Sequence, residues 1–302
     1  MSNNATTTNV YISNNKITVL TGSYAKNLLS VRNIYEAPLE EGAILNGTIM
    51  NDFAIKDALT HLWEDNSISK SNIQLVVSAN NMTVKLMNLP QFDEKTAVGL
   101  IKQEFQDMDD IKDLLVDYTI INPKNEDGSC TILAVLSSKQ IIEAYIKIFQ
   151  EVGIGLASID IVQNALIKLA RIFEYLEHKT YAFFLMDGGT LMQYMFTDNR
   201  YIMTRRSRIF SDPSDDSFEQ EVSMTINSII QFHKSEQTGT ELTDFFLCGF
   251  PEETEYLFDQ FAQNFGVKVQ SFPVFKETEL IFPEDKNPGD YIVPLGGMIR
   301  YE

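Results

Sequence analysis

The sequence predicts an α/β protein of two similar lobes, with a small α+β insert in the first lobe. Three observations predict this class. One order of elements, strand, turn, strand, turn, strand, helix and strand, occurs twice, beginning near Thr8 and near Tyr181. The block between the two copies has a different order. A length of 302 residues is also sufficient for about two domains.

The first copy is expected to contain four strands and one helix. The strands are predicted at residues 8–13, 16–22, 27–35 and 73–78, and the helix at residues 51–66. Asn14 and Asn15 separate the first two strands, and because asparagine tolerates positive φ they predict a tight turn. Asn51 or Asp52 can cap the helix. Its predicted buried face, at helical spacing, consists of Phe53, Ile55, Leu59, Leu62 and Trp63.

The second copy repeats this order with little residue identity, so chance recurrence of a generic pattern remains the alternative. Its strands are predicted at residues 181–186, 191–197, 200–210 and 245–248, and its helix at residues 215–236. Asp187-Gly188-Gly189-Thr190 forms the first predicted turn and Asp198-Asn199 the second. On the strand at 200–210, Arg205, Arg206 and Arg208 are expected to form ion pairs with the acidic surface.

The block between the copies predicts a small α+β subdomain. Its strands are expected at residues 82–89, 116–122 and 129–137, and its helices at 93–107 and 140–152. An amphipathic helix over residues 158–175 is predicted to lead into the second copy. A helix at 252–265 and a strand at 267–271 are predicted after that copy. The predicted domains are residues 1–80 with 157–180, the insert 81–156, and residues 181–302.

Composition excludes several classes of function. The net charge of −18 disfavours binding to nucleic acid and to anionic lipid. The N-terminus lacks the basic and apolar regions of a secretory signal, and no apolar run is long enough to span a bilayer. Cys130 and Cys248 are expected to be reduced core thiols of a cytoplasmic protein. His61, His178 and His233 have no spacing typical of a metal site.

Two copies of a hairpin, strand and helix around a cleft match the plan of actin-like nucleotide-binding folds. In that plan each hairpin turn holds phosphates, which requires an acid to orient metal-bound water and glycine to admit the phosphate oxygens. The second turn fits this requirement. The candidate cofactor-binding residues are Asp187, Gly188, Gly189, Thr190, Lys16 and Gly249.

The other two sites of the plan are altered. The first turn has Tyr11 and Ser13 where the plan expects Asp and Gly, although Lys16 could still meet a phosphate. The adenosine site keeps Gly249, but Phe250 replaces the second glycine and would crowd or stack on a purine. These residues argue against ATP hydrolysis and leave binding of ATP and Mg²⁺ open, with no cofactor as the expectation.

An ordered series of short motifs resembles the actin-like PilM family of type IV pilus assembly proteins, relatives of the division protein FtsA. Asp187 and Gly189 are similar to the family's second phosphate turn, and Asp117-Tyr118 resembles the start of a strand in its inserted subdomain. The remaining motifs are Gly47 with Ile49, residues 78–80 through Leu89-Pro90, Glu104, residues 133–135, Tyr145, Gly153, Ile159-Asp160, residues 218–235 and residues 294–300.

The resemblance implies a cytoplasmic scaffold that binds the cytoplasmic tail of a single-span, PilN-like inner-membrane protein. The tail would lie in a groove between the first lobe and the insert, and the scaffold would reach the inner face of the membrane through this partner, without inserting into it. The resemblance leaves self-association open. An ATPase or sugar-kinase-like enzyme and an FtsA-like polymer-forming protein are the alternatives; the second would require a basic amphipathic tail, which the end at Glu302 lacks.

Overall fold

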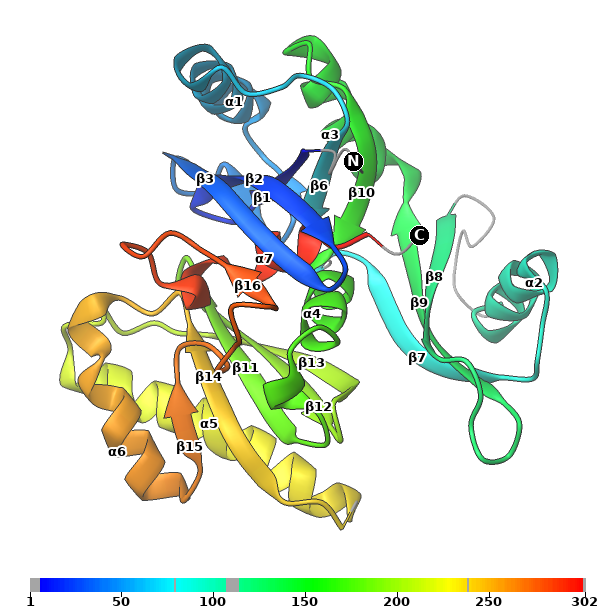
Figure 1. Cartoon of the computed structure of the whole chain (residues 1–302), viewed down its shortest axis with the longest axis vertical. Coiled ribbons are helices and arrows are strands. Elements are labelled where there is room, and N and C mark those ends of the chain that lie inside the picture. Colours follow the sequence, from blue (N-terminus) through cyan, green and yellow to red (C-terminus); the bar gives the residue numbers. More distant parts are fainter. Residues whose placement is uncertain (1–5, 79, 107–113, 238, 301–302) are drawn as a thin grey trace.

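A computed structural model describes residues 6–78, 80–106, 114–237 and 239–300. Two large β-sheets form the two lobes, and a three-stranded sheet forms the insert (Figure 1). Ala79, in the motif at residues 78–80, and Asp107, the end of the helix predicted at 93–107, lie outside the described residues.

The first lobe contains a six-stranded sheet with the order β10-β6-β1-β2-β3-β16. β1 runs antiparallel to β2 and parallel to β6. The strands are β1 (Thr7–Ile12), β2 (Lys16–Ala25), β3 (Leu28–Pro38), β6 (Ile73–Val77), β10 (Leu156–Ile161) and β16 (Leu280–Ile281). Helices α1 (Asp52–Asn66) and α3 (Lys139–Glu151) pack on one face through a shared apolar cluster.

The second lobe repeats this arrangement. Its sheet has the order β13-β12-β11-β14-β15, in which β11 runs antiparallel to β12 and parallel to β14. The strands are β11 (Thr180–Asp187), β12 (Thr190–Thr197), β13 (Arg200–Arg208), β14 (Leu242–Cys248) and β15 (Lys268–Gln270). Helices α5 (Asp216–Glu236) and α6 (Tyr256–Phe265) cover one face. The predicted duplicated actin-like α/β fold is therefore confirmed.

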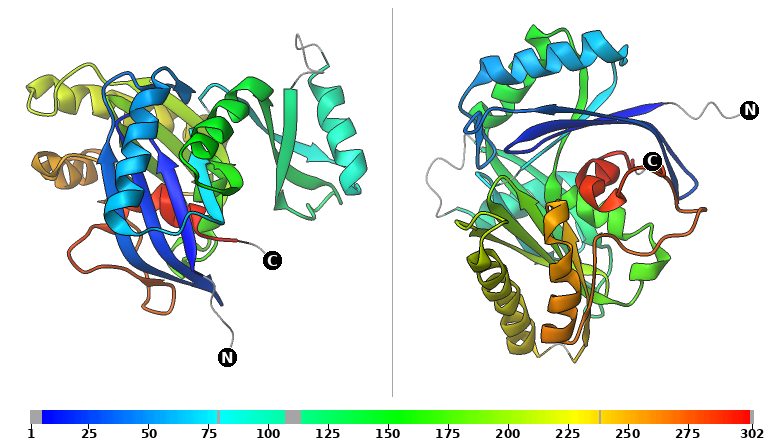
Figure 2. Two further views of the ribbon diagram at one scale, coloured as in Figure 1. Left: turned by 90° about the horizontal axis from the view of Figure 1, so that it is seen from above. Right: turned by 90° about the vertical axis from the view of Figure 1, so that its left-hand side faces the viewer.

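Two short helices fill the space between the lobes. α4 (Val162–Ala170) and α7 (Ile292–Gly297) belong to one buried cluster that also includes residues of both sheets (Figure 2). The helices approach closely because α7 has glycine where a side chain would collide. A Cβ at Gly296 would overlap the carbonyl of Ala165, and one at Gly297 would overlap the side chain of Asn9.

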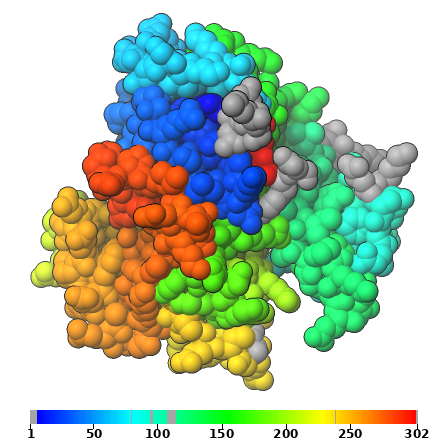
Figure 3. All heavy atoms as spheres, in the orientation of Figure 1, coloured from blue at the N-terminus to red at the C-terminus, as the bar shows by residue number. Residues whose placement is uncertain are grey.

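The insert is a sheet with one helix on its outer face. The strand order is β7-β9-β8, with β7 (Thr83–Leu89), β8 (Leu114–Asn122) and β9 (Cys130–Ser138), and α2 (Glu94–Glu104) packs on it. Figure 3 shows the insert (teal) standing out from the two lobes. The short elements are β4 (Ile44–Leu45), β5 (Thr48–Ile49), η2 (Glu174–Leu176), η3 (Glu252–Thr254) and η4 (Pro288–Tyr291).

The predicted helix over residues 158–175 is wrong at its start. Residues up to Ile161 form β10, parallel to β6, and α4 begins only afterwards. Asp160 marks the change, because its carboxylate accepts hydrogen bonds from the Ile161 amide and the Asn164 side chain and pairs with Lys168 at 2.7 Å. Side-chain caps of this kind stop one element and start the next without changing the apolar pattern.

One local prediction in the first lobe also fails, and one predicted turn forms with a different backbone conformation. Phe53 is 72% exposed, because it lies two residues from buried Ile55 and such side chains are about 200° apart around a helix. The predicted tight turn between β1 and β2 is confirmed, but Asn14 and Asn15 both keep negative φ. The turn is instead held by Ser13, whose amide and hydroxyl both donate to the carbonyl of Lys16.

The arginines of β13 do not form the predicted ion pairs with any described acid. Arg206 donates to the side-chain oxygen of Asn46, while Arg205 lies over the ring of Phe232 at 5.2 Å. Three residues predicted to lie in the core are buried: Cys130 and Cys248, both with free thiols, and Trp63. No helix among the described residues is long and apolar enough to cross a membrane.

The close contact of α4 with α7 predicts that Gly296→Ala destabilises the protein. Extra volume in a packed core typically costs about 1–3 kcal/mol. The matched control is Gly99→Ala in α2, where a Cβ meets nothing within 4 Å and alanine is the better helix former. Urea unfolding should show a loss for Gly296→Ala only. Equal stability of the two variants would contradict the contact.

Candidate functional site

The two hairpin turns of the lobes touch each other directly. The carboxylate of Asp187, at the end of β11, accepts hydrogen bonds from the backbone amide of Asn14 at 3.0 and 3.1 Å and from its side-chain amide at 2.9 Å. Asn14 lies in the turn between β1 and β2. These three contacts join residues 173 positions apart and link the lobes at the point where the fold would hold phosphates.

Burial makes this contact important for stability. Asp187 is only 7% exposed, and burial raises the pKa of its carboxyl, while the Asn14 amide opposes the rise. No described cation lies within ion-pair distance of this carboxylate. Hydrogen bonds to a charged group contribute about 1.5–3 kcal/mol, so Asn14 supplies the main compensation for burying the charge.

The rest of the first turn is closed by its own side chains. Tyr11 is buried in the core, and burial raises the pKa of its hydroxyl well above the ordinary value. The hydroxyl of Ser13 donates to the side chain of Asn15 and to the Lys16 carbonyl. No residue of this turn offers a carboxylate to a metal ion or a glycine to a phosphate.

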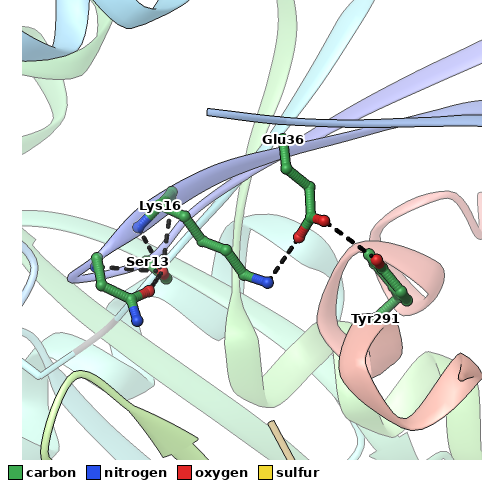
Figure 4. A network of polar contacts seen from close by, with 5 residues as sticks. Ser13, Lys16, Glu36 and Tyr291 are labelled. Carbon is green, nitrogen blue, oxygen red and sulfur yellow. Dashed lines mark hydrogen bonds and ion pairs between the residues drawn. The ribbon is translucent and has the colours of Figure 1, made fainter. Parts of the chain in front are cut away.

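Lys16 binds within its own lobe. Its ammonium lies 2.6 Å from Glu36 on β3, whose other oxygen accepts a hydrogen bond from the hydroxyl of Tyr291 at 3.2 Å (Figure 4). The ammonium also lies 5.8 Å from the centre of the Tyr291 ring. This half-exposed network ties β2 and β3 to η4, and it directs the charge of Lys16 to Glu36.

The second turn has the predicted shape. Gly188 and Gly189 have φ of +53° and +71°, as a two-residue type I′ hairpin requires. Gly188 faces the first turn, since a Cβ there would lie 3.4 Å from the Cβ of Asn14. A small cavity of about 210 Å³ lies beside the turns. Of the predicted residues, Gly188 and Thr190 line it, whereas Lys16, Asp187, Gly189 and Gly249 do not.

At the predicted adenosine site, Gly249 and Phe250 both contact neighbouring protein groups. Gly249 has φ of +66°, and a Cβ there would lie 2.8 Å from the carbonyl of Met186. Its amide hydrogen-bonds to the carboxylate of Asp290, whose pKa is raised by burial. The ring of Phe250 packs edge-on against Phe218 at 6.5 Å.

The residues at these turns therefore do not fit a magnesium nucleotide. The one acid at the turns, Asp187, has both oxygens engaged by Asn14, and the opposite turn supplies no second acid. Within the part of the chain that the structure describes, no group of three or more His, Cys, Asp or Glu side chains is placed to hold a metal ion. No step of phosphate chemistry follows from this geometry.

A second feature is a groove between the insert and the first lobe, here called the β8–β10 groove. It has a volume of about 300 Å³ and lies where β8 and β10, each the end strand of its sheet, approach one another. Its apolar lining includes Leu115, Leu133, Val135, Ile142 and Ile159, and its charged residues are Asp117 and Asp160. The side-chain oxygen of Asn164 is buried there and accepts no hydrogen bond from a described residue.

A sequence model of the family described as type IV pilus assembly protein PilM matches residues 9–210, which is more than half of the chain. The chain belongs to the PilM family. Among curated proteins, none matches its sequence.

Solved structures agree with this PilM assignment at the level of the fold. A structure described as a PilM–PilN type IV pilus biogenesis complex has a TM-score of 0.78 at 11% identity, covering 98% of this chain and 100% of that one. A Bacteroides thetaiotaomicron protein with an actin-like ATPase fold and unknown function has a TM-score of 0.55 at 12% identity, and the match covers 96% of both chains. The cytoplasmic domain of EpsL, an inner-membrane component of the type II secretion system of Vibrio cholerae, has a TM-score of 0.51 at 11% identity. This match covers 97% of this chain and 94% of that one.

Sequence reasoning missed several residues that form the contacts at and beside the two turns. Asn14 was treated only as a turn former, and Glu36, Asp290 and Tyr291 were not singled out. Their partners are distant in sequence, so no spacing could reveal them. One signal was available in the sequence. Asn14 lies in the altered first turn, and its amide can donate a hydrogen bond to the acid of the second turn.

The raised pKa of Asp187 predicts a specific pH dependence. In the unfolded chain the Asp187 carboxyl has a pKa of about 4. Because folding raises this pKa, the stability that the carboxyl contributes is fully present below pH about 4 and is lost as the pH rises through the pKa of the folded state. Wild type should therefore lose unfolding free energy relative to Asp187→Asn as pH rises from about 4 to about 7. Urea unfolding across this range measures it. A difference independent of pH would show that the carboxyl is not desolvated.

Proposed function

We propose that this PilM-family protein is a cytoplasmic scaffold of a type IV pilus or related secretion assembly. It binds the cytoplasmic tail of a single-span, PilN-like inner-membrane protein in the β8–β10 groove, and this partner recruits it to the inner face of the membrane. It is not an enzyme, and its nucleotide binding is weak or lost. In this proposal residues 81–156 form the insert, residues 1–80 with 157–180 the first lobe, and residues 181–302 the second.

The observation that carries the proposal is the pair of open strand edges in the groove. β8 ends the sheet of the insert and β10 ends the sheet of the first lobe, so the outer backbone groups of both strands lack a neighbouring strand among the described residues. An extended peptide can satisfy such groups by adding a strand, while pockets along the groove accept its alternate side chains. The unpartnered oxygen of Asn164 would accept a further N–H from the peptide.

Charge favours a basic tail. Two acids line the groove and no basic residue does, in a chain with a net charge of −18. Asp160 already pairs with Lys168, so the local attraction comes from Asp117. Cytoplasmic segments next to a membrane span are commonly rich in Lys and Arg. Attraction over the whole surface would raise the rate of encounter, and the apolar lining would supply the affinity.

The relatives support the same reading. The solved structure with a TM-score of 0.78 is described as a complex of PilM with PilN, and the type II secretion relative is described as the cytoplasmic domain of an inner-membrane component. The first name supports a PilN-like partner, and the second supports a position beside the inner membrane. The geometry of the turns supports the loss of nucleotide chemistry, because Asp187 is engaged by Asn14.

Leu115→Lys should weaken tail capture at least about tenfold. The substitution removes an apolar contact and places a like charge against a basic tail. A tenfold loss corresponds to about 1.4 kcal/mol, and loss of an apolar anchor at the centre of an interface costs about 2 kcal/mol or more. The probe is a labelled synthetic peptide of the cytoplasmic tail of the single-span membrane protein encoded beside this gene, and fluorescence anisotropy measures its binding.

Ile120→Lys is the matched control for this experiment. Leu115 and Ile120 lie on the same strand and are both 43% exposed, but only Leu115 lines the groove. The control should bind the peptide as wild type does. If both variants bind equally well, or if the peptide does not bind wild type, the tail does not occupy this groove.

A further inference from the structure

A second groove lies on the other side of the insert, here called the β7–β13 groove. It has a volume of about 410 Å³ and is lined by residues of β7 and β13, among others. β7 is the other end strand of the insert sheet, and β13 is an end strand of the second lobe's sheet (Figure 1). The groove is therefore also bordered by two open strand edges, and neither belongs to the β8–β10 groove.

The lining of this groove contains a buried side-chain oxygen, that of Gln163, with no hydrogen-bond donor among the described residues. Gln163, at the start of α4, is only 5% exposed. A buried acceptor without a donor typically costs about 1–3 kcal/mol, so most such groups have a partner in the functional state. The missing group is a donor, such as the N–H of a peptide backbone.

The charges of this groove are opposite to those of the β8–β10 groove. Its charged lining residues are Lys85, Arg205 and Arg206, and it contains no acid although the whole chain carries a net charge of −18. Lys85 pairs with Glu104 at 2.6 Å. The contacts of Arg205 and Arg206 are with the neutral side chains of Phe232 and Asn46, so no described acid neutralises either guanidinium.

We propose that the β7–β13 groove binds an acidic, extended segment of another protein. The segment lies between the two open edges, its carboxylates bind Arg205 and Arg206, and one of its backbone N–H groups donates to Gln163. Guanidinium groups suit this task because each presents five donors in a fork that matches a carboxylate. The protein then has one groove for a basic segment and another for an acidic one, on opposite edges of one small sheet.

The test uses methionine signals of the full chain. Met192 and Met203 line the β7–β13 groove and not the β8–β10 groove, whereas Met50 and Met224 are exposed and line neither. Protein labelled with ¹³C at the methionine methyl groups is titrated to millimolar concentration with a capped hexapeptide that alternates glutamate and valine. The Met192 and Met203 signals should shift, and the Met50 and Met224 signals should not. A hexapeptide alternating lysine and valine should shift none of the four.

Three variants separate binding from folding. Arg205→Glu with Arg206→Glu should abolish the shifts, whereas Arg200→Glu should retain them, because Arg200 lies on the same strand and does not line the groove. Gln163→Met should weaken binding several-fold while leaving the free protein at least as stable, since it removes the unpartnered oxygen.

Three results would overturn the proposal. The first is no shift of Met192 and Met203 with the acidic peptide, and the second is an equal shift with the basic one. The third is a shift of the same signals with protein concentration alone, which would identify a second copy of this chain as the occupant. Loss of tail capture in the Leu115→Lys variant would leave this groove unaffected, so the two proposals fail separately.

Discussion

The hydrogen bonds between Asp187 and Asn14 are the interaction on which the arrangement of the two lobes depends. A carboxylate that is 7% exposed needs donors, and the described residues that supply them belong to the opposite lobe. The acid that an actin-like fold would use to orient metal-bound water therefore acts as a link between two protein turns. Tyr11 and Ser13 occupy the first turn, where an actin-like phosphate site would need an acid and a glycine.

This link has a consequence for both grooves. The insert belongs to the first lobe, whereas β13 belongs to the second, so the width of the β7–β13 groove depends on how the lobes close. The Asp187–Asn14 contact and the Arg206–Asn46 contact both cross between the lobes. The β8–β10 groove lies between the insert and its own lobe and does not depend on closure in this way.

Local chemistry made much of the fold predictable from sequence. The Asp187 to Thr190 turn and the Asp198-Asn199 turn both adopt positive φ at their central residues, which their residue types allow. Regular apolar spacing predicted α1 and α5, and the repeated order of elements predicted the two lobes. The domain boundaries and the cofactor role of Lys16, Asp187, Gly188, Gly189, Thr190 and Gly249 stay predictions.

Tertiary contacts decided what the sequence could not show. β10 forms because β6 offers a parallel partner and Asp160 ends the strand, and neither fact is visible in the apolar pattern. Asn14 finds its acid 173 residues away, and Arg205 and Arg206 meet neutral partners in place of the expected acids. Both grooves arise between sheets that are far apart in sequence, so their lining residues have no common motif.

A crystal structure of the full chain grown with millimolar Mg-ATP tests the central claim most directly. The account predicts that the Asp187 carboxylate remains about 3 Å from the Asn14 amide, with no phosphate between the two turns. A magnesium nucleotide held between separated turns, with Asp187 facing the water of the metal, would contradict it.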